Sequence, residues 1–341
     1  MNFDYSDDQQ AIKSTAREFL ASRFKLEKVR ELAIAGEYDS SLWDQIAELG
    51  WPGIFVDESF GGQGLGIVEL AILMEELGYA CAPAPFLSNA AAGLLVAHAG
   101  SDEQRERFLP GVASGEARGT VGQVANGAAP LVPDADTSSF VVLLENGGGS
   151  ATVVETAALQ PEPVDTIDST RRFFRVESAG AGESLEGDVE GAVQRIEIAV
   201  AAELTGVAQR AMEMAVEYAK DRKQFDRPIG AYQGVAHRCA RMVLEVESAR
   251  ATTLYAAWAA DNEPESLPIG ASMAKAFAAD AGWNVTASSL QVHGGIGFTW
   301  EHDLHWLLKR ARTDCALFGS ARQHRDRVAE LAGLSRSAAA V

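Results

Sequence analysis

The stretch Gln291-Val292-His293-Gly294-Gly295-Ile296-Gly297 separates two runs of residues that both have helical apolar spacing. Glycine loses more backbone freedom on folding than any other residue, so three glycines in four positions interrupt a helix. By itself, the pair Gly294-Gly295 predicts a tight turn between two helices.

The region around this turn predicts a bundle of helices. The helix that begins at Val193 carries an apolar stripe whose members lie three or four residues apart: Ile196, Val200, Leu204, Val207, Ala211, Met214 and Tyr218. Further helices are predicted over about 233–260, 268–290, 301–313 and 321–334. Since the connections between them are short, neighbouring helices are expected to run antiparallel.

Two regions that differ in residue pattern precede the bundle. Residues 1–118 predict a helical domain, and residues 119–188 a small β domain, before the bundle over 189–341. Two capping boxes open helices in the first region, Ser6 with Gln9 and Ser101 with Gln104, and the second of these helices is expected to end at Leu109-Pro110. Further helices are predicted there over 41–49 and 68–77. Runs of β-type residues predict strands over 140–144, 151–155 and 172–176. The predicted fold is therefore mostly α, with a reduced β domain and an antiparallel four-helix-type bundle.

The composition excludes several classes of protein. The chain has 341 residues, is 47% apolar and carries a net charge of −19, which argues against nucleic acid or an anionic membrane surface as its main partner. Its three cysteines have no CxxC spacing and its six histidines form no ligand motif, so a reducing compartment and no metal site are expected. Without a signal-peptide pattern or a span of roughly 20 apolar residues, a cytoplasmic protein is predicted.

In the order of its regions and in local strings, the chain resembles the acyl-CoA dehydrogenase family. The strings in the first domain are Trp51-Pro52-Gly53-Ile54, Gly61-Gly62-Gln63-Gly64-Leu65-Gly66, 69–78, Pro83-Ala84-Pro85-Phe86 and 109–115. The strings in the bundle are Asp221-Arg222-Lys223-Gln224-Phe225, Gln233, the glycine turn and Phe298-Thr299-Trp300-Glu301-His302-Asp303. The resemblance covers both helical domains, and its motifs occur in the family's order.

This resemblance implies an enzyme that removes two hydrogens from the α and β carbons of an acyl-CoA thioester. A carboxylate takes the α proton, FAD accepts the β hydride, and electron transfer flavoprotein is the expected electron acceptor. In the family each FAD spans a subunit interface, and the neighbouring bundle binds its pyrophosphate and adenosine end. The cofactor-binding residues implied here are Arg222, Gln224, Phe225, Ile229, Gln233, Gln291, Val292, Gly294 and Gly295. Taken singly, Arg222 could be a helix C-terminal cation and Phe225 a core residue.

The sequence departs from the family at the catalytic base. The family's usual glutamate precedes Gly-Thr or Gly-Ser, and the matching string here is Leu317-Phe318-Gly319-Ser320. Phe318 cannot accept a proton, so no catalytic residue is assigned. Glu197 and Glu203, near the start of the first bundle helix, are the candidate substitutes. The alternative is that both are ordinary carboxylates on a helix surface.

A second departure concerns the flavin ring. Family members place a Trp-Ile-Thr or Trp-Ile-Ser segment against it, whereas this chain has no tryptophan between residues 52 and 257. Both losses affect the half-site that this chain would provide for its own substrate. The resemblance thus implies the shortened subunit of an α2β2 acyl-CoA dehydrogenase of the actinobacterial steroid type, with a full-length partner subunit. A self-sufficient homotetramer with Glu197 or Glu203 as base, and a structural subunit without FAD contact, are the alternatives.

Overall fold

The computed structural model describes residues 4–177 and 182–334. The chain divides into two compact units, each made of segments that are not consecutive in sequence. The bundle unit comprises Met1–Leu26, Ala71–Ala82 and Glu197–Val341, and the mixed unit comprises Glu27–Leu70 and Pro83–Ile196. The division into three consecutive domains stays a prediction.

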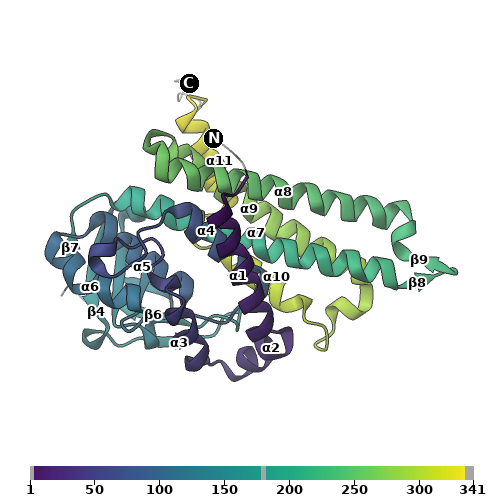
Figure 1. The fold of residues 1–341 in the computed structure, drawn as a ribbon, viewed down its shortest axis with the longest axis horizontal. Helices are drawn as coiled ribbons and strands as arrows, with labels where there is room; N and C mark the ends of the chain where they lie inside the picture. The colour runs from purple at the N-terminus through teal and green to yellow at the C-terminus, as the bar shows by residue number, and fades with distance from the viewer. Residues whose placement is uncertain (1–3, 178–181, 335–341) are drawn as a thin grey trace. The chain divides into compact units, whose positions relative to one another are not determined.

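The bundle unit is built from long helices (Figure 1). They are α1 (Asp7–Arg23), the end of α4 (Ile67–Ala80), most of α7 (Val189–Asp221), α8 (Gln233–Asn262), α9 (Leu267–His293), α10 (Leu304–Asp314) and α11 (Ala321–Leu331). A two-stranded hairpin of β8 (Lys223–Gln224) and β9 (Arg227–Pro228) joins α7 to α8. Small buried residues such as Ala274, Ala278 and Gly282 line α9, which lets neighbouring helices approach closely.

The mixed unit combines helices with two small sheets. Its helices are α2 (Leu26–Ala35), α3 (Ser40–Glu48), the start of α4, α5 (Phe86–Ala99) and α6 (Asp102–Ser114). One sheet has the order β1-β3-β4-β7, formed by Gly119–Gln123, Phe140–Glu145, Ser150–Glu155 and Glu183–Leu185. The other has the order β2-β6-β5, formed by Ala128–Pro133, Phe173–Glu177 and Glu162–Val164. Strands β1 and β3 pair in parallel, and the other pairs within these two sheets are antiparallel.

The core of the mixed unit is shared by both sheets. Val141 and Leu143 of β3 and Val154 of β4 are buried together with Val132 of β2 and Val176 of β6. Side chains of one face therefore point inward from each sheet, as the period of two along a strand requires.

The mostly helical fold with a small β domain is confirmed, and three details of the prediction are corrected. Helix α6 does not end at Pro110 but continues to Ser114, because Pro110 lies on the exposed face, where water can reach the carbonyl left without its N–H partner. Helices α2 and α5 were not predicted. Helix α5 is buried almost all round, so its sequence lacks a polar face and has no amphipathic period.

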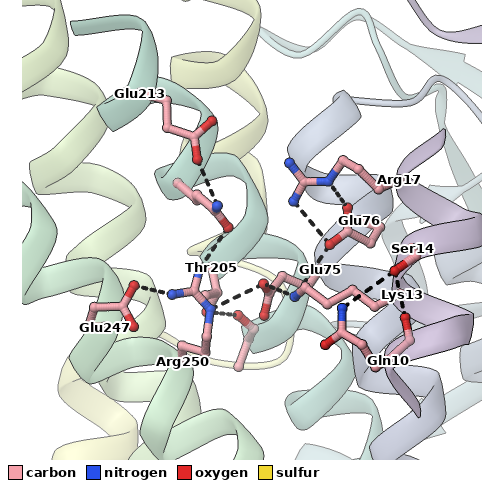
Figure 2. Close-up of polar contacts among 12 residues, drawn as sticks. Gln10, Lys13, Ser14, Arg17, Glu75, Glu76, Thr205, Glu213, Glu247 and Arg250 are labelled. Atoms are coloured by element: carbon pink, nitrogen blue, oxygen red, sulfur yellow. Dashed lines mark hydrogen bonds and ion pairs between the residues drawn. The ribbon is translucent and has the colours of Figure 1, made fainter. Parts of the chain in front are cut away.

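A network of buried charges ties α1 to α4 and α8 within the bundle unit (Figure 2). Glu75 and Glu76 of α4 are 3% and 1% exposed. Lys13 Nζ of α1 donates to Glu75 at 2.8 Å, Arg250 Nε of α8 donates to the same oxygen at 3.2 Å, and Arg17 of α1 pairs with Glu76. Each buried carboxylate thus has a cationic partner, without which its burial would be costly.

Across the described residues, every helix is too short or too polar to cross a lipid bilayer.

Candidate functional site

The predicted cofactor-binding segments meet at one end of the bundle unit. Helix α7 ends at Asp221 and α9 ends at His293, and the rings of Tyr218 and His293 stack with centroids 4.6 Å apart. Helix α8 begins at the same end with Gln233, directly after the hairpin that follows α7 (Figure 1). The structure therefore brings together segments that lie about seventy residues apart in sequence.

The hairpin displays Phe225 to solvent. Phe225 and Asp226 both have positive φ angles, 53° and 61°, as the two central residues of a type I′ turn do. The Phe225 side chain is 88% exposed, so its interpretation as a core residue is wrong. Tyr232 braces the hairpin, because its hydroxyl donates to the Gln224 carbonyl at 2.9 Å and its ring lies edge-on to Phe225. Tyr232 was not predicted, because its position before the start of α8 carries no motif.

Arg222 is an exposed cation at the base of this hairpin. Its main-chain carbonyl accepts from the N–H of Ile229 at 2.8 Å, which fixes the backbone on both sides of the hairpin. In the part of the chain that the structure describes, no carboxylate lies within ion-pair distance of its guanidinium. An exposed guanidinium without a carboxylate partner can pair with a phosphate group.

The glycine turn is open on its outer side. Gly294 has φ 64° and ψ −139°, a conformation reserved for glycine, and its N–H caps α9 by donating to Leu290. A Cβ atom at Gly294 or Gly295 would meet no atom within 4 Å. Gln291 is exposed beside the turn, whereas the Val292 side chain is buried, so Val292 can contact a ligand only through its backbone.

Replacing Gly294 with alanine is expected to destabilise the turn by about 1–3 kcal/mol, because an L-residue is strained at this backbone conformation. Gly295→Ala is the matched control, since Gly295 has no positive φ and equal space for a Cβ. The shift in the midpoint of urea unfolding measures both. Equal midpoints for the two variants would show that backbone strain does not govern this turn.

The loop that matches the family's base position holds no carboxylate and is fixed from within. Lys275 of α9 is fully buried and donates from Nζ to the Gly319 carbonyl at 2.9 Å. His324 Nε2 lies 2.9 Å from the Phe318 carbonyl. Burial lowers the pKa of the Lys275 amino group and lowers the pKa of His324 to about 4. Phe318, with φ 54°, therefore sits in a braced loop rather than a mobile one.

The two candidate substitutes for the base are buried. Glu197 and Glu203 are 3% and 2% exposed, so the interpretation of both as helix-surface carboxylates is wrong. Arg310, itself 1% exposed, donates from Nη1 to Glu203 at 2.6 Å and from Nη2 to the Ala82 carbonyl. Glu197 Oε1 lies 3.9 Å from Arg327 Nη1. The stripe read from the sequence described only one face of α7, whereas α7 is buried on more than one face over this stretch.

The end of the bundle unit offers groups suited to a dinucleotide. They are an exposed guanidinium, amide side chains, an exposed aromatic ring and an open glycine turn, and together they fit the phosphates and adenosine of FAD. These groups fit a FAD-dependent oxidoreductase, in which the cofactor carries the redox chemistry and the protein binds and orients it.

The comparison with protein-family models supports this class of enzyme. Residues 6–116 match the acyl-CoA dehydrogenase N-terminal domain, and residues 191–332 match the acyl-CoA dehydrogenase C-terminal domain. The chain belongs to the acyl-CoA dehydrogenase family, whose members are FAD-dependent oxidoreductases.

Similar proteins include one curated relative and two solved structures. The acyl-CoA dehydrogenase IpdE2 of Mycolicibacterium smegmatis is 33% identical, with 93% of this chain and 96% of that protein covered. A structure of the Tcur3481-Tcur3483 steroid acyl-CoA dehydrogenase has a TM-score of 0.88 at 25% identity, covering 96% and 98%. The ChsE4-ChsE5 complex of Mycobacterium tuberculosis has a TM-score of 0.89 at 24% identity, covering 99% and 100%, which shows a shared fold.

Proposed function

We propose that this chain is the shortened subunit of a heteromeric acyl-CoA dehydrogenase. In this assembly it binds the pyrophosphate and adenosine half of FAD, and a full-length partner subunit supplies the flavin pocket and the base. The observation that carries the proposal is the contrast between two sites of one chain. The side chains of Arg222 and Gln291 are exposed and the glycine turn is open, whereas Phe318 replaces the carboxylate at the base position.

The residues of this chain would act by binding and orienting. The guanidinium of Arg222 pairs with a phosphate oxygen, and the open backbone at Gly294 and Gly295 lets the cofactor approach closely. Phe225 offers an exposed ring for stacking, and the Gln224, Gln233 and Gln291 amides offer hydrogen bonds. FAD, once bound, supplies the hydride acceptor for α,β-dehydrogenation.

Burial and pairing count against Glu203 as an independent base. A general base must reach the substrate, whereas the Glu203 carboxylate is buried and accepts a hydrogen bond from Arg310. The similarity to a steroid acyl-CoA dehydrogenase and to the ChsE4-ChsE5 complex supports a CoA ester of a steroid side chain as substrate and a heterotetramer as the assembly. Electron transfer flavoprotein is proposed as electron acceptor.

The test is co-expression with the neighbouring open reading frame, followed by a flavin count per chain. We expect a colourless chain alone and a yellow, active complex. In the complex, Arg222→Ala is expected to weaken FAD binding about 10- to 100-fold, the value of one charge-assisted hydrogen bond. Arg322→Ala is the matched control, because Arg322 is an exposed arginine of the same unit whose ion pair with Asp326 is long, at 4.0 Å.

Turnover and full flavin occupancy of the chain without a partner would refute the heteromeric assembly. Unchanged flavin content in the Arg222→Ala complex would refute the contribution of this chain to the FAD site and would favour a purely structural subunit.

A further inference from the structure

Two arginines of the mixed unit are held at the ends of one turn, residues 134–139, which joins β2 to β3. The Asp134 N–H donates to the Arg172 carbonyl at 2.9 Å, and the Ser139 N–H donates to the Arg118 carbonyl at 2.6 Å. Burial lowers the pKa of the Arg118 guanidinium, and the positive charge of Arg172 acts in the same direction. The two side chains are therefore close enough to repel each other.

Each of these guanidinium groups lies over an aromatic ring from the segment around the start of α3. Arg172 Cζ is 4.4 Å from the centre of the Tyr38 ring, and Arg118 Cζ is 5.5 Å from the centre of the Trp43 ring. Such stacking uses the flat face of a guanidinium and leaves the N–H groups in its plane available for other partners. The Tyr38 hydroxyl donates to the buried Asp134 carboxylate, which fixes this ring against the turn.

The protein uses only some of the N–H groups of the two arginines. Arg118 is partly exposed, and in the described part of the chain no carboxylate lies within ion-pair distance of it. Arg172 Nη1 pairs with Asp136 at 2.8 Å, but Arg172 Nε is buried without a hydrogen-bond acceptor among the described residues. A buried N–H of a charged group without an acceptor costs free energy. Donors of both arginines thus remain for an anion that enters from solvent.

We propose that Arg118 and Arg172 form a clamp for the phosphate or carboxylate group of a small molecule. Two neighbouring guanidinium groups offer several N–H donors to the oxygens of one anion, and hydrogen bonds between opposite charges are about twice as strong as neutral ones. Since the side chain of Arg172 is 22% exposed, a small ligand reaches it more readily than a folded protein surface does. None of the residues predicted to bind FAD belongs to this clamp, so the proposal does not rest on the proposed function.

The experiment is a calorimetric titration of the full chain with inorganic phosphate and with sodium acetate, at an ionic strength held constant with sodium chloride. The chain carries Arg222→Ala throughout, so that the predicted FAD site does not contribute. We expect saturable binding of at least one of the two anions, and the tighter of the two identifies the ligand group as phosphate or carboxylate. Arg118→Met is expected to weaken that binding about tenfold, the value of one hydrogen bond to a charged group, while its apolar side chain still covers Trp43.

Asp136→Asn tests the same clamp in the opposite direction. It removes the negative charge that competes for Arg172, so anion binding is expected to become about 2- to 5-fold tighter, the value of a partly exposed ion pair. Damage to the fold would weaken binding instead. Arg107→Met is the matched control, because Arg107 lies over the Phe108 ring in the same unit but pairs with Glu183 at 2.9 Å. It is expected to leave anion binding unchanged.

Absence of saturable binding by both anions would overturn the clamp, and so would unchanged binding in Arg118→Met. Asp136→Asn decides the question if Arg118→Met does not fold, since unchanged or weaker binding in Asp136→Asn would overturn the clamp as well. Loss of the partner subunit in Arg118→Met with normal anion binding would also overturn it, because Arg118 would then contact a protein. Each of these results leaves the proposed FAD site at Arg222 standing.

Discussion

Replacing Arg310 with methionine is expected to lower the free energy of unfolding by about 3–5 kcal/mol. The side chains of Arg310 and Glu203 are 2% and 3% exposed, and Arg310 Nη1 lies 2.6 Å from Glu203 Oε1. Methionine has similar length but no charge, so the variant would keep much of the volume and leave the Glu203 carboxylate buried without its guanidinium. Urea unfolding of the purified chain, followed by circular dichroism, measures the loss.

The double variant Glu203→Leu with Arg310→Met separates charge from packing. It removes both charges, so it is expected to be more stable than Arg310→Met alone. Arg322→Ala serves as the surface control and is expected to change stability by no more than about 0.5 kcal/mol. A loss of less than about 1 kcal/mol for Arg310→Met would show that water or a rearranged neighbour compensates Glu203. In that case the pairing with Arg310 would no longer argue against Glu203 as a candidate base.

Local sequence signals located most of the bundle. Capping boxes at Ser6 and Ser101 are present in the structure as expected, and the helical period from Val193 onward led to α7 through α11. The signals failed where the surroundings of an element decide its identity. Strand β1 contains two glycines and depends on pairing with β3, so its five residues carry little preference of their own.

The candidate site likewise contains residues that the sequence predicted and features that it did not. Motif resemblance identified Arg222 and Gly294, because the residue types themselves carry the chemistry. The burial of Glu203 was not predictable, since a helical period does not say which neighbour covers each face. Motifs in a sequence can therefore identify exposed residues that contact a cofactor. They do not show whether a carboxylate on a long helix is buried, or what role it has.

The charge network in Figure 2 leads to a prediction about pH. Burial alone would raise the pKa of Glu75, but Arg250 and Lys13 outweigh it, and the pKa of Glu75 is lowered. A carboxyl whose folded pKa is below its unfolded value of about 4.5 stabilises the fold at higher pH. This contribution is complete above pH 4.5 and is lost as the pH falls through the folded pKa.

Arg250→Met is expected to destabilise the chain by about 2–4 kcal/mol at pH 7, because Glu75 then loses one of the two cations paired with it in the described structure and keeps Lys13. Burial would outweigh Lys13 alone, so the pKa of Glu75 would rise in the variant, and protonation would relieve the unpaired charge. The difference between variant and unaltered chain should therefore shrink as the pH falls from 7 to about 4.

Arg241→Met on the same helix is the control, since the side chain of Arg241 is 80% exposed and, among the described residues, pairs with Glu245 alone. It should cost little at either pH. Urea midpoints at pH 7 and pH 4 measure both variants. A constant difference between Arg250→Met and the unaltered chain would mean that Arg250 acts through packing or through its contacts with Glu247 and Gln209, and not through the charge of Glu75. A shrinking difference would show that the electrostatic link between α4 and α8 is what holds these helices together in the bundle unit.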